Sequence, residues 1–113
     1  MPPSVQAPCS ALAASLSISD LRLRNSGNWT AERQRIITDA ASNVQLFTIA
    51  TNGVPAEVAR ALEVLKGYSV WLGDTVADAP SFDAANSAVN AFPDLDATTR
   101  ATSVVNEWMR ANC

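Results

Sequence analysis

The sequence predicts an all-α fold, an up-and-down bundle of four main helices plus one short helix. Three observations predict this class. Apolar residues recur at spacings of three and four along most of the chain, which is the period of one helical face. Gly, Pro and Asn gather in short segments between these runs, where they end helices. No segment keeps the sustained alternation of a strand.

The length and composition predict one domain. The chain has 113 residues, of which 48% are hydrophobic, enough for a core without metals or many cross-links. Its first eight residues include three prolines and predict an extended tail over residues 1–8, followed by a single helical-bundle domain over residues 9–113. The tail lacks the charged and apolar regions of a signal peptide. A cytoplasmic protein and the mature form of a secreted domain both fit this start.

The first helix is expected over residues 10–24. Leu12, Leu16 and Leu23 lie near one helical stripe. The serines weaken this helix, and the alternation from Ser17 to Arg24 leaves a short strand open as an alternative. Residues 25–28, which read Asn-Ser-Gly-Asn, end the segment.

The second helix has the clearest signals. Asn28 or Thr30 can cap it, and Glu32 lies in the first turn, where a negative charge suits the helix dipole. Gly53 is expected to end it in the left-handed conformation that glycine adopts at little cost. Its apolar stripe comprises Ile36, Ile37, Ala40, Val44, Phe47 and Thr51.

The third helix is expected from Pro55 to Val76. Gly67 and Gly73 in its interior each cost about 1 kcal/mol relative to alanine and mark close packing or a bend. Its apolar stripe comprises Val58, Ala61, Leu62, Leu65, either Tyr68 or Ser69, Leu72 and Val76.

Two further helices complete the chain. Ser81 can cap a short helix from Phe82 to about Ala91. Pro93 interrupts the chain, and Asp94 or Asp96 caps the last helix. The apolar stripe of that helix comprises Ala101, Val104, Val105, Trp108 and Ala111, with Arg110 in the last turn.

The composition weighs against several classes of function. The net charge is −3 and the eight basic residues are scattered, whereas a nucleic-acid-binding protein needs a basic face. No apolar run is long enough to span a membrane. The chain has no histidine, the commonest general base and metal ligand. Its carboxylate pairs, such as Asp74 with Asp78, are better explained as helix caps and solvated faces. We therefore expect no enzyme, no metal and no cofactor.

The two cysteines predict a disulfide. Cys9 opens the predicted domain and Cys113 is the last residue, and an antiparallel bundle with an even number of helices brings its two ends together. Such a bridge would close a loop of about 100 residues and stabilise the fold by up to roughly 4 to 5 kcal/mol. Disulfides persist in oxidising compartments, so the pair favours an exported protein. Two unrelated free thiols are the alternative.

Tyr68 and Trp71 are the candidate ligand-binding residues, because they lie close together on the third helix. Tyrosine can ligate haem iron. The alternative is that both rings are ordinary packing residues.

The two ends of the chain also carry a resemblance. Ala7-Pro8-Cys9 precedes the first helix, and residues 105–113 read Val-Asn-Glu-Trp-Met-Arg-Ala-Asn-Cys. This resembles small exported, disulfide-closed helical domains of actinobacteria, most of which have no assigned activity. The resemblance implies an extracytoplasmic location and a helical fold. Residues 6–9 are not a lipobox, which leaves Cys9 available for the bridge.

These observations lead to two hypotheses. The first is a non-enzymatic extracytoplasmic module, closed by a terminal disulfide, that binds an unknown protein partner or serves a cell-envelope role. The alternative is a carrier of a small apolar ligand, a lipid or haem, in a cavity between helices.

Overall fold

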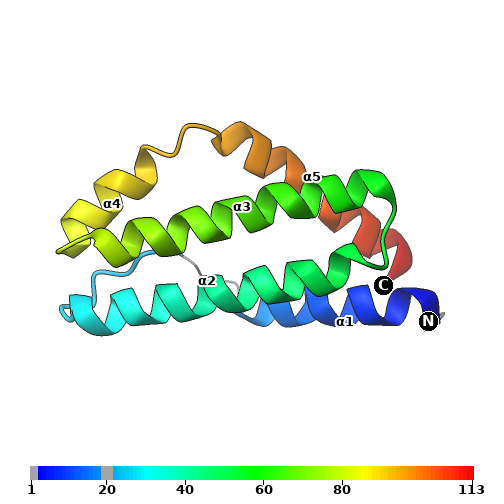
Figure 1. Cartoon of the computed structure of the whole chain (residues 1–113), viewed down its shortest axis with the longest axis horizontal. Helices are drawn as coiled ribbons and strands as arrows, with labels where there is room; N and C mark the ends of the chain where they lie inside the picture. Colours follow the sequence, from blue (N-terminus) through cyan, green and yellow to red (C-terminus); the bar gives the residue numbers. More distant parts are fainter. Residues whose placement is uncertain (1–2, 19–21) are drawn as a thin grey trace.

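The fold is an all-α bundle, as the sequence predicts. The computed structural model describes residues 3–18 and 22–113, and within these ranges it contains no strand. The helices are α1 (Pro3–Ile18), α2 (Trp29–Thr51), α3 (Ala56–Asp78), α4 (Phe82–Asn90) and α5 (Leu95–Asn112). Four are long and α4 has nine residues, in agreement with four main helices plus a short one (Figure 1).

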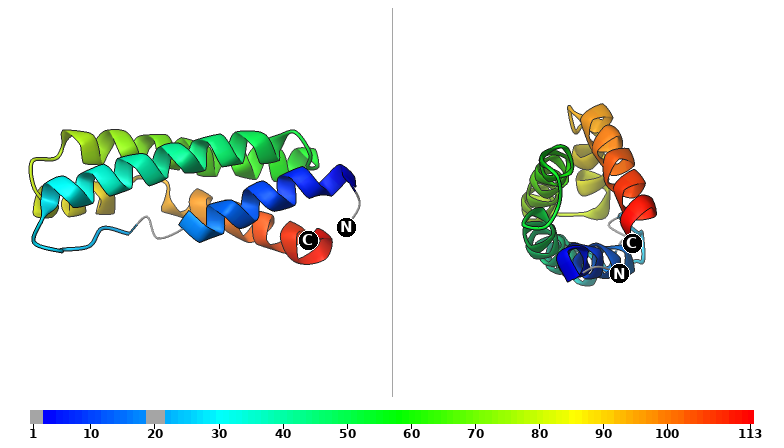
Figure 2. Two further views of the ribbon diagram at one scale, coloured as in Figure 1. Left: turned by 90° about the horizontal axis from the view of Figure 1, so that it is seen from below. Right: turned by 90° about the vertical axis from the view of Figure 1, so that its right-hand side faces the viewer.

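The long helices α2 and α3 form the central antiparallel pair. α1 packs on α2, α5 packs on α3, and α4 folds back on the end of α3. Figure 2 shows α2 and α3 side by side along one side of the bundle, with α1 and α5 on the other. The molecule measures 46 × 25 × 18 Å. Among the helices that the structure describes, none covers the opposite broad face of the α2/α3 pair.

The prediction of an extended tail over residues 1–8 is wrong for residues 3–8, because α1 begins at Pro3. A proline suits the first turn of a helix, where its missing N–H would have no partner. Pro8 lies inside α1 and is fully buried, and Cys9 is buried beside it. Burial of this segment outweighs the poor helix propensity of its prolines.

The first helix is shorter at its other end than predicted. α1 ends at Ile18, residues 19–21 lie outside the described part, and residues 22–24 are neither helix nor strand. Side chains of α2 hold this segment: the Arg24 backbone N–H donates to the Glu32 carboxylate, and Arg35 Nη2 donates to the Arg22 carbonyl at 2.9 Å. The α2 side chains in these contacts lie 8 and 13 residues further along the sequence. Their hydrogen bonds hold the backbone of residues 22–24 outside the helix that the apolar pattern predicts.

The helix ends confirm two predicted caps and correct a third. Asn28 Oδ1 accepts from the Ala31 N–H at 3.2 Å, and Ser81 Oγ accepts from the Ala84 N–H at 3.2 Å. Gly53 is not left-handed, however. α2 ends instead in a tight turn, in which the Gly53 N–H donates to the Ala50 carbonyl at 3.2 Å. Among the described residues only Gly27 has a positive φ, 82°.

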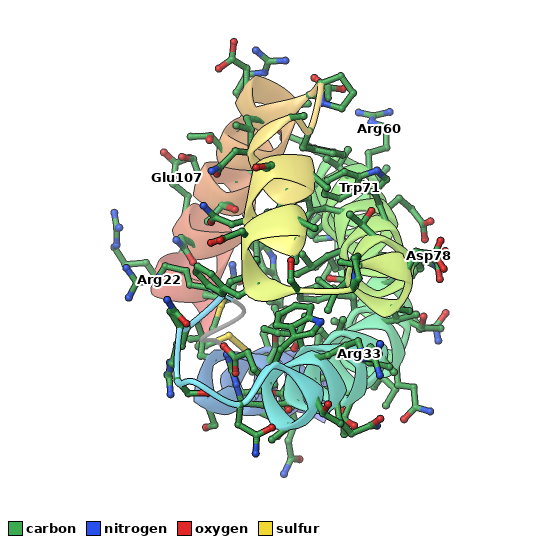
Figure 3. All side chains as sticks on the ribbon, turned by 90° about the vertical axis from the view of Figure 1, so that its left-hand side faces the viewer. Arg22, Arg33, Arg60, Trp71, Asp78 and Glu107 are labelled. Atoms are coloured by element: carbon green, nitrogen blue, oxygen red, sulfur yellow. A yellow bond between two sulfur atoms is a disulfide. The ribbon has the colours of Figure 1, made fainter. Side chains whose placement is uncertain are left out.

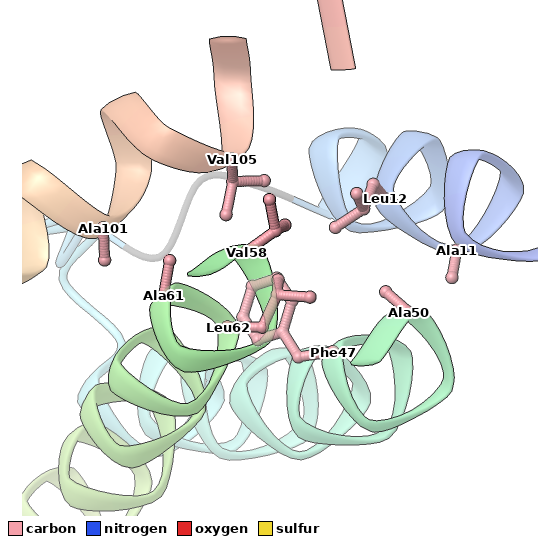
Figure 4. Packing of buried hydrophobic residues seen from close by; sticks show 9 residues of the cluster. All are labelled: Ala11, Leu12, Phe47, Ala50, Val58, Ala61, Leu62, Ala101 and Val105. Atoms are coloured by element: carbon pink, nitrogen blue, oxygen red, sulfur yellow. The ribbon is translucent and has the colours of Figure 1, made fainter. Parts of the chain in front are cut away.

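Two apolar clusters lie at opposite ends of the bundle. The first joins α1, α2, α3 and α5 near the chain ends (Figure 4), and comprises Ala11, Leu12, Phe47, Ala50, Val58, Ala61, Leu62, Ala101 and Val105. The second centres on Ile36, Leu72 and Val76 of α2 and α3, and Trp29, Tyr68, Trp71 and Val89 pack against it. Trp29 Nε1 donates to the Ala79 carbonyl at 2.9 Å, which joins the start of α2 to the end of α3.

Candidate functional site

The predicted disulfide between Cys9 and Cys113 is present. The two Sγ atoms are 2.01 Å apart and the Cα atoms 5.7 Å apart. Cys9 is buried on α1, whereas Cys113 is exposed at the end of α5. The bridge therefore ties α1 to α5 at one end of the bundle.

Beyond the disulfide, α1 and α5 diverge. α5 runs obliquely towards the end of the bundle that holds both termini (Figure 1). It packs mainly on α3 and makes few contacts with α1. The seam holds a groove of about 240 Å³, which we name the α1/α5 groove. Its lining comprises Leu12, Ser15, Leu16, Asn43, Phe47, Leu65, Thr102, Val105, Asn106 and Met109.

Leu16 stands at this groove and is 57% exposed, although its stripe predicts a core position. Leu12, one turn earlier, is only 2% exposed. Leu12 belongs to the apolar cluster that includes Ala101 and Val105 of α5, whereas Leu16 does not. One large apolar side chain at the groove is thus left uncovered.

A polar pair lies within the apolar lining. Ser15 Oγ donates to Asn43 Oδ1 at 3.0 Å, and the two residues are 7% and 4% exposed. The Asn43 Nδ2 group donates to no described residue. Among the described residues, every fully buried polar side-chain atom has a hydrogen-bond partner. Because Asn43 Nδ2 has none, it is not fully buried, and it reaches solvent through the groove that Asn43 lines. Asn43 therefore presents an unused N–H donor to whatever enters the groove.

The α1 wall of the groove carries no charge. None of the 16 residues of α1 is acidic or basic, and its exposed positions include Ala13, Ala14 and Ser17. Charged side chains are depleted from the centres of protein interfaces. The exposed surface of α1 beside the groove is likewise without charge.

Substitutions at Ser15 and Asn43 should show how much their hydrogen bond contributes to the free energy of unfolding. We expect Ser15→Ala to lower the free energy of unfolding by about 1 kcal/mol, because Asn43 Oδ1 loses its donor. The double variant Ser15→Ala/Asn43→Leu should recover most of this loss, since apolar groups of similar shape replace both partners. Urea unfolding of the two variants and the parent measures both effects. A double variant less stable than Ser15→Ala would contradict this account of the pair.

The structure brings Tyr68 and Trp71 together at the other end of the bundle. Their ring centroids are 6.0 Å apart, and Phe92 packs on both, at 5.0 Å from Tyr68 and 4.6 Å from Trp71. Burial raises the pKa of the Tyr68 phenol above its usual value, which keeps it protonated. Phe92, which the sequence analysis did not select, thus joins the candidate pair, and ligand binding there stays a prediction.

Figure 3 shows Arg22, Arg33 and Arg60 well apart on the bundle. In the described ranges no three His, Cys, Asp or Glu side chains come together in a group that could hold a metal ion.

No helix in the described part of the chain combines the length and apolar character needed to cross a bilayer.

Comparisons with protein-family models, curated proteins and solved structures find no match to this chain.

Sequence reasoning missed the groove and its polar pair. Asn43 lies three residues after Ala40 and four before Phe47, so it occupies the apolar stripe of α2. An amide on such a stripe and an uncharged helix were the available signals. The sequence did not reveal that α5 would leave α1 uncovered, because crossing angles depend on packing across the whole bundle.

Proposed function

We propose that this protein is a non-enzymatic extracytoplasmic module that binds an amphipathic helix of a partner protein in the α1/α5 groove. The observation that carries the proposal is the pairing of exposed Leu16 with the unused Asn43 Nδ2 donor in one groove. The apolar lining supplies the affinity, and the amide selects a partner with an acceptor in register.

The walls of the groove favour a helix as its occupant. Leu12 and Leu16 on α1 are four residues apart, as are Val105 and Met109 on α5. Side chains four apart form the ridges that interlock with those of another helix. A third helix lying between α1 and α5 would close the seam of the bundle.

The charge pattern narrows the partner further. Because α1 has no charged residue, a charge on the docking face of the partner would be buried without a counterpart, which is costly. The partner helix is therefore expected to present an uncharged apolar stripe, interrupted by one amide or hydroxyl oxygen that accepts from Asn43. A single polar group in such a stripe sets the register between helices.

The size of the groove favours a helix over a small molecule. Its volume is about 240 Å³, whereas pockets for drug-sized ligands measure roughly 300 to 1,000 Å³ and enclose most of the ligand. A helix needs only to place two or three side chains in the groove, and the rest of its face can rest on the exposed surface of α1.

The disulfide supports the extracytoplasmic part of the proposal. Bridges of this kind persist outside the reducing cytosol. The resemblance of the chain ends to exported helical domains points the same way. Intact mass of the protein from its natural source tests this: oxidised protein weighs two hydrogens less than reduced protein. Two free thiols in that material would overturn the assignment of compartment.

A library of constrained helical peptides tests the binding function. Selection on the disulfide-closed protein should enrich peptides with an uncharged stripe at four-residue spacing. Leu16→Glu should weaken the enriched peptides at least tenfold, about 1.4 kcal/mol, because it buries an unpaired charge at the contact. Isothermal titration calorimetry measures the affinities.

Val64→Glu is the matched control, because Val64 is also exposed, at 39%, but lies on α3 outside the groove. It should leave peptide binding unchanged. The variant Ser15→Ala/Asn43→Leu should keep the fold and weaken the selected peptides. Selected peptides that bind the Leu16→Glu variant as tightly as the parent, or no enrichment at all, would refute the proposed function.

A further inference from the structure

We propose that the seam between α3 and α5 is a second docking surface, which binds a partner helix through a carboxylate on that helix. The seam holds a groove of about 260 Å³, which we name the α3/α5 groove. Two exposed arginines from different helices, Arg60 and Arg100, line it together. No residue lines both this groove and the α1/α5 groove, so the proposal goes beyond the function proposed above.

Each wall of the α3/α5 groove is one face of a helix. The α3 wall consists of residues 57, 60, 61 and 64, and the α5 wall of residues 97, 100, 101 and 104. These positions follow the spacing of three and four that places side chains on one face over two helical turns. A groove with two such walls accepts a third helix, whose side chains enter between them.

The groove also offers apolar contact. Ala61 and Ala101 are buried at its base, while Val104 is half-buried. Val64 is 39% exposed, so the bundle itself leaves much of this side chain uncovered. A partner helix that covers these valines removes apolar surface from water, which favours binding.

The two arginines have no partner within the part of the chain that the structure describes, neither a hydrogen bond nor an ion pair. Glu57 precedes Arg60 by three residues and Asp96 precedes Arg100 by four, yet neither carboxylate forms a salt bridge. Lys66 does pair with a glutamate at such a spacing. Both guanidinium groups are thus available to an acceptor from another molecule.

A carboxylate is the acceptor that suits this pair. The planar guanidinium group matches the two oxygens of a carboxylate, and the charged hydrogen bonds are stronger than neutral ones. α3 runs away from the end of the bundle that holds both termini, and α5 runs towards it (Figure 1). Glu57 and Val104 therefore belong to one end of the groove, and Arg60 and Arg100 to its middle. The partner is expected to place its carboxylate at the centre of an apolar stripe.

Glu57 restricts the partner further. Its negative charge lies at one end of the same groove, where it repels a second anionic group. Nucleic acid carries a negative charge on every phosphate, so it fits this mixture of charges poorly. A helix with a single acidic side chain on its docking face meets both arginines without placing a second negative charge against Glu57.

NMR of the arginine side chains tests the proposal on the full disulfide-closed protein. The probe is a stapled alanine-based helix with one central glutamate and a leucine one turn before and after it. Its analogue has glutamine in place of the glutamate. We expect the glutamate probe to shift the Nε–H signals of Arg60 and Arg100 and to bind about tenfold more tightly than the analogue. Arg60→Gln and Arg100→Gln should each remove this preference, and neither should impair folding because both residues are exposed.

Arg110→Gln is the matched control for charge. Arg110 is also an exposed arginine of α5 but lies outside the groove, so this variant should bind the glutamate probe as the parent does. Leu16→Glu should also leave binding unchanged, because it alters only the α1/α5 groove. Failure of the α1/α5 groove to bind helices would therefore not affect this test.

Four results would overturn the proposal. The first is the absence of any shift at Arg60 and Arg100 up to millimolar probe. The second is equal binding of the glutamate probe and its glutamine analogue. The third is an equal loss of affinity in Arg110→Gln and Arg100→Gln, which would indicate general charge attraction. The fourth is displacement of the probe by millimolar inorganic phosphate that shifts the same two signals, which would assign the arginines to a small anion.

Discussion

Opening the Cys9–Cys113 disulfide is expected to lower the free energy of unfolding by about 4 kcal/mol. The two cysteines are 104 residues apart, so the bridge closes nearly the whole chain into a loop. Cross-linking such distant residues removes much conformational freedom from the unfolded chain, by about 4.7 kcal/mol for a 100-residue loop. The native helices remain compatible with the open form, because α1 still packs on α2 and α5 on α3.

Urea unfolding of the oxidised protein, the reduced protein and the variant Cys9→Ala/Cys113→Ser measures this effect. The reduced protein and the variant should agree, since both lack the cross-link. Hydrogen exchange should show that the amides of α1 lose the most protection, because α1 makes few contacts with α5 apart from the bridge. A loss below about 1 kcal/mol would contradict a cross-linking role.

Replacing Glu32 should have the next largest effect. Its side chain is 5% exposed and accepts from Arg35 Nε at 2.7 Å, from Arg35 Nη2 at 3.1 Å and from the Arg24 backbone N–H. Glu32→Gln removes the charge that these donors share, and we expect a loss of about 2 to 3 kcal/mol in the free energy of unfolding. The loss should appear together with greater hydrogen exchange in residues 22–28.

Glu63→Gln is the matched control. Glu63 pairs with Lys66 three residues later at 3.0 Å, as Glu32 pairs with Arg35, but its side chain is 55% exposed. Exposed pairs contribute about 0 to 1 kcal/mol, so this variant should stay close to the parent. Equal losses in the two variants would show that burial adds nothing to the Glu32 contact.

The same group predicts a pH dependence. The hydrogen bond from Arg35 lowers the pKa of Glu32, despite an opposing effect of burial, with help from the Arg24 N–H. The folded state therefore binds this proton less readily than the unfolded state. The stabilisation is complete above the ordinary glutamate pKa of about 4.3 and is lost as the pH falls through the lowered value. The difference between parent and Glu32→Gln should shrink over the same range.

Much of the fold could be predicted from local signals. The apolar spacing of α2 and α3 and the cap at Ser81 depend on neighbouring residues, so sequence alone located them. Cys9 and Cys113 could be paired because bundle topology brings the chain ends together. Errors arose where distant contacts decide the backbone. Pro8 is helical because it is buried, and residues 22–24 leave the helix because Glu32 and Arg35 bind their backbone.

The candidate site was less accessible to sequence reasoning. Tyr68 and Trp71 were selected as neighbours on one helix, and the structure adds Phe92 from a different segment. Leu16 lies on the predicted stripe of the first helix and was expected to be buried. Asn43 lies on the stripe of the second helix, and the sequence analysis did not select it. Exposure of Leu16 follows from the oblique path of α5, a property of the assembled bundle that no single segment encodes.

The closed ends give the protein an uncommon mechanical property. If the chain were pulled from either side of the bridge, the S–S bond between Cys9 and Cys113 would carry the force, and the residues between the two cysteines would not lengthen. An open chain of this length could extend by roughly 3.4 Å per residue once its helices unravelled. Under tension the disulfide-closed domain would therefore keep its helices folded and its α1/α5 groove intact, whereas an open chain would unfold and extend.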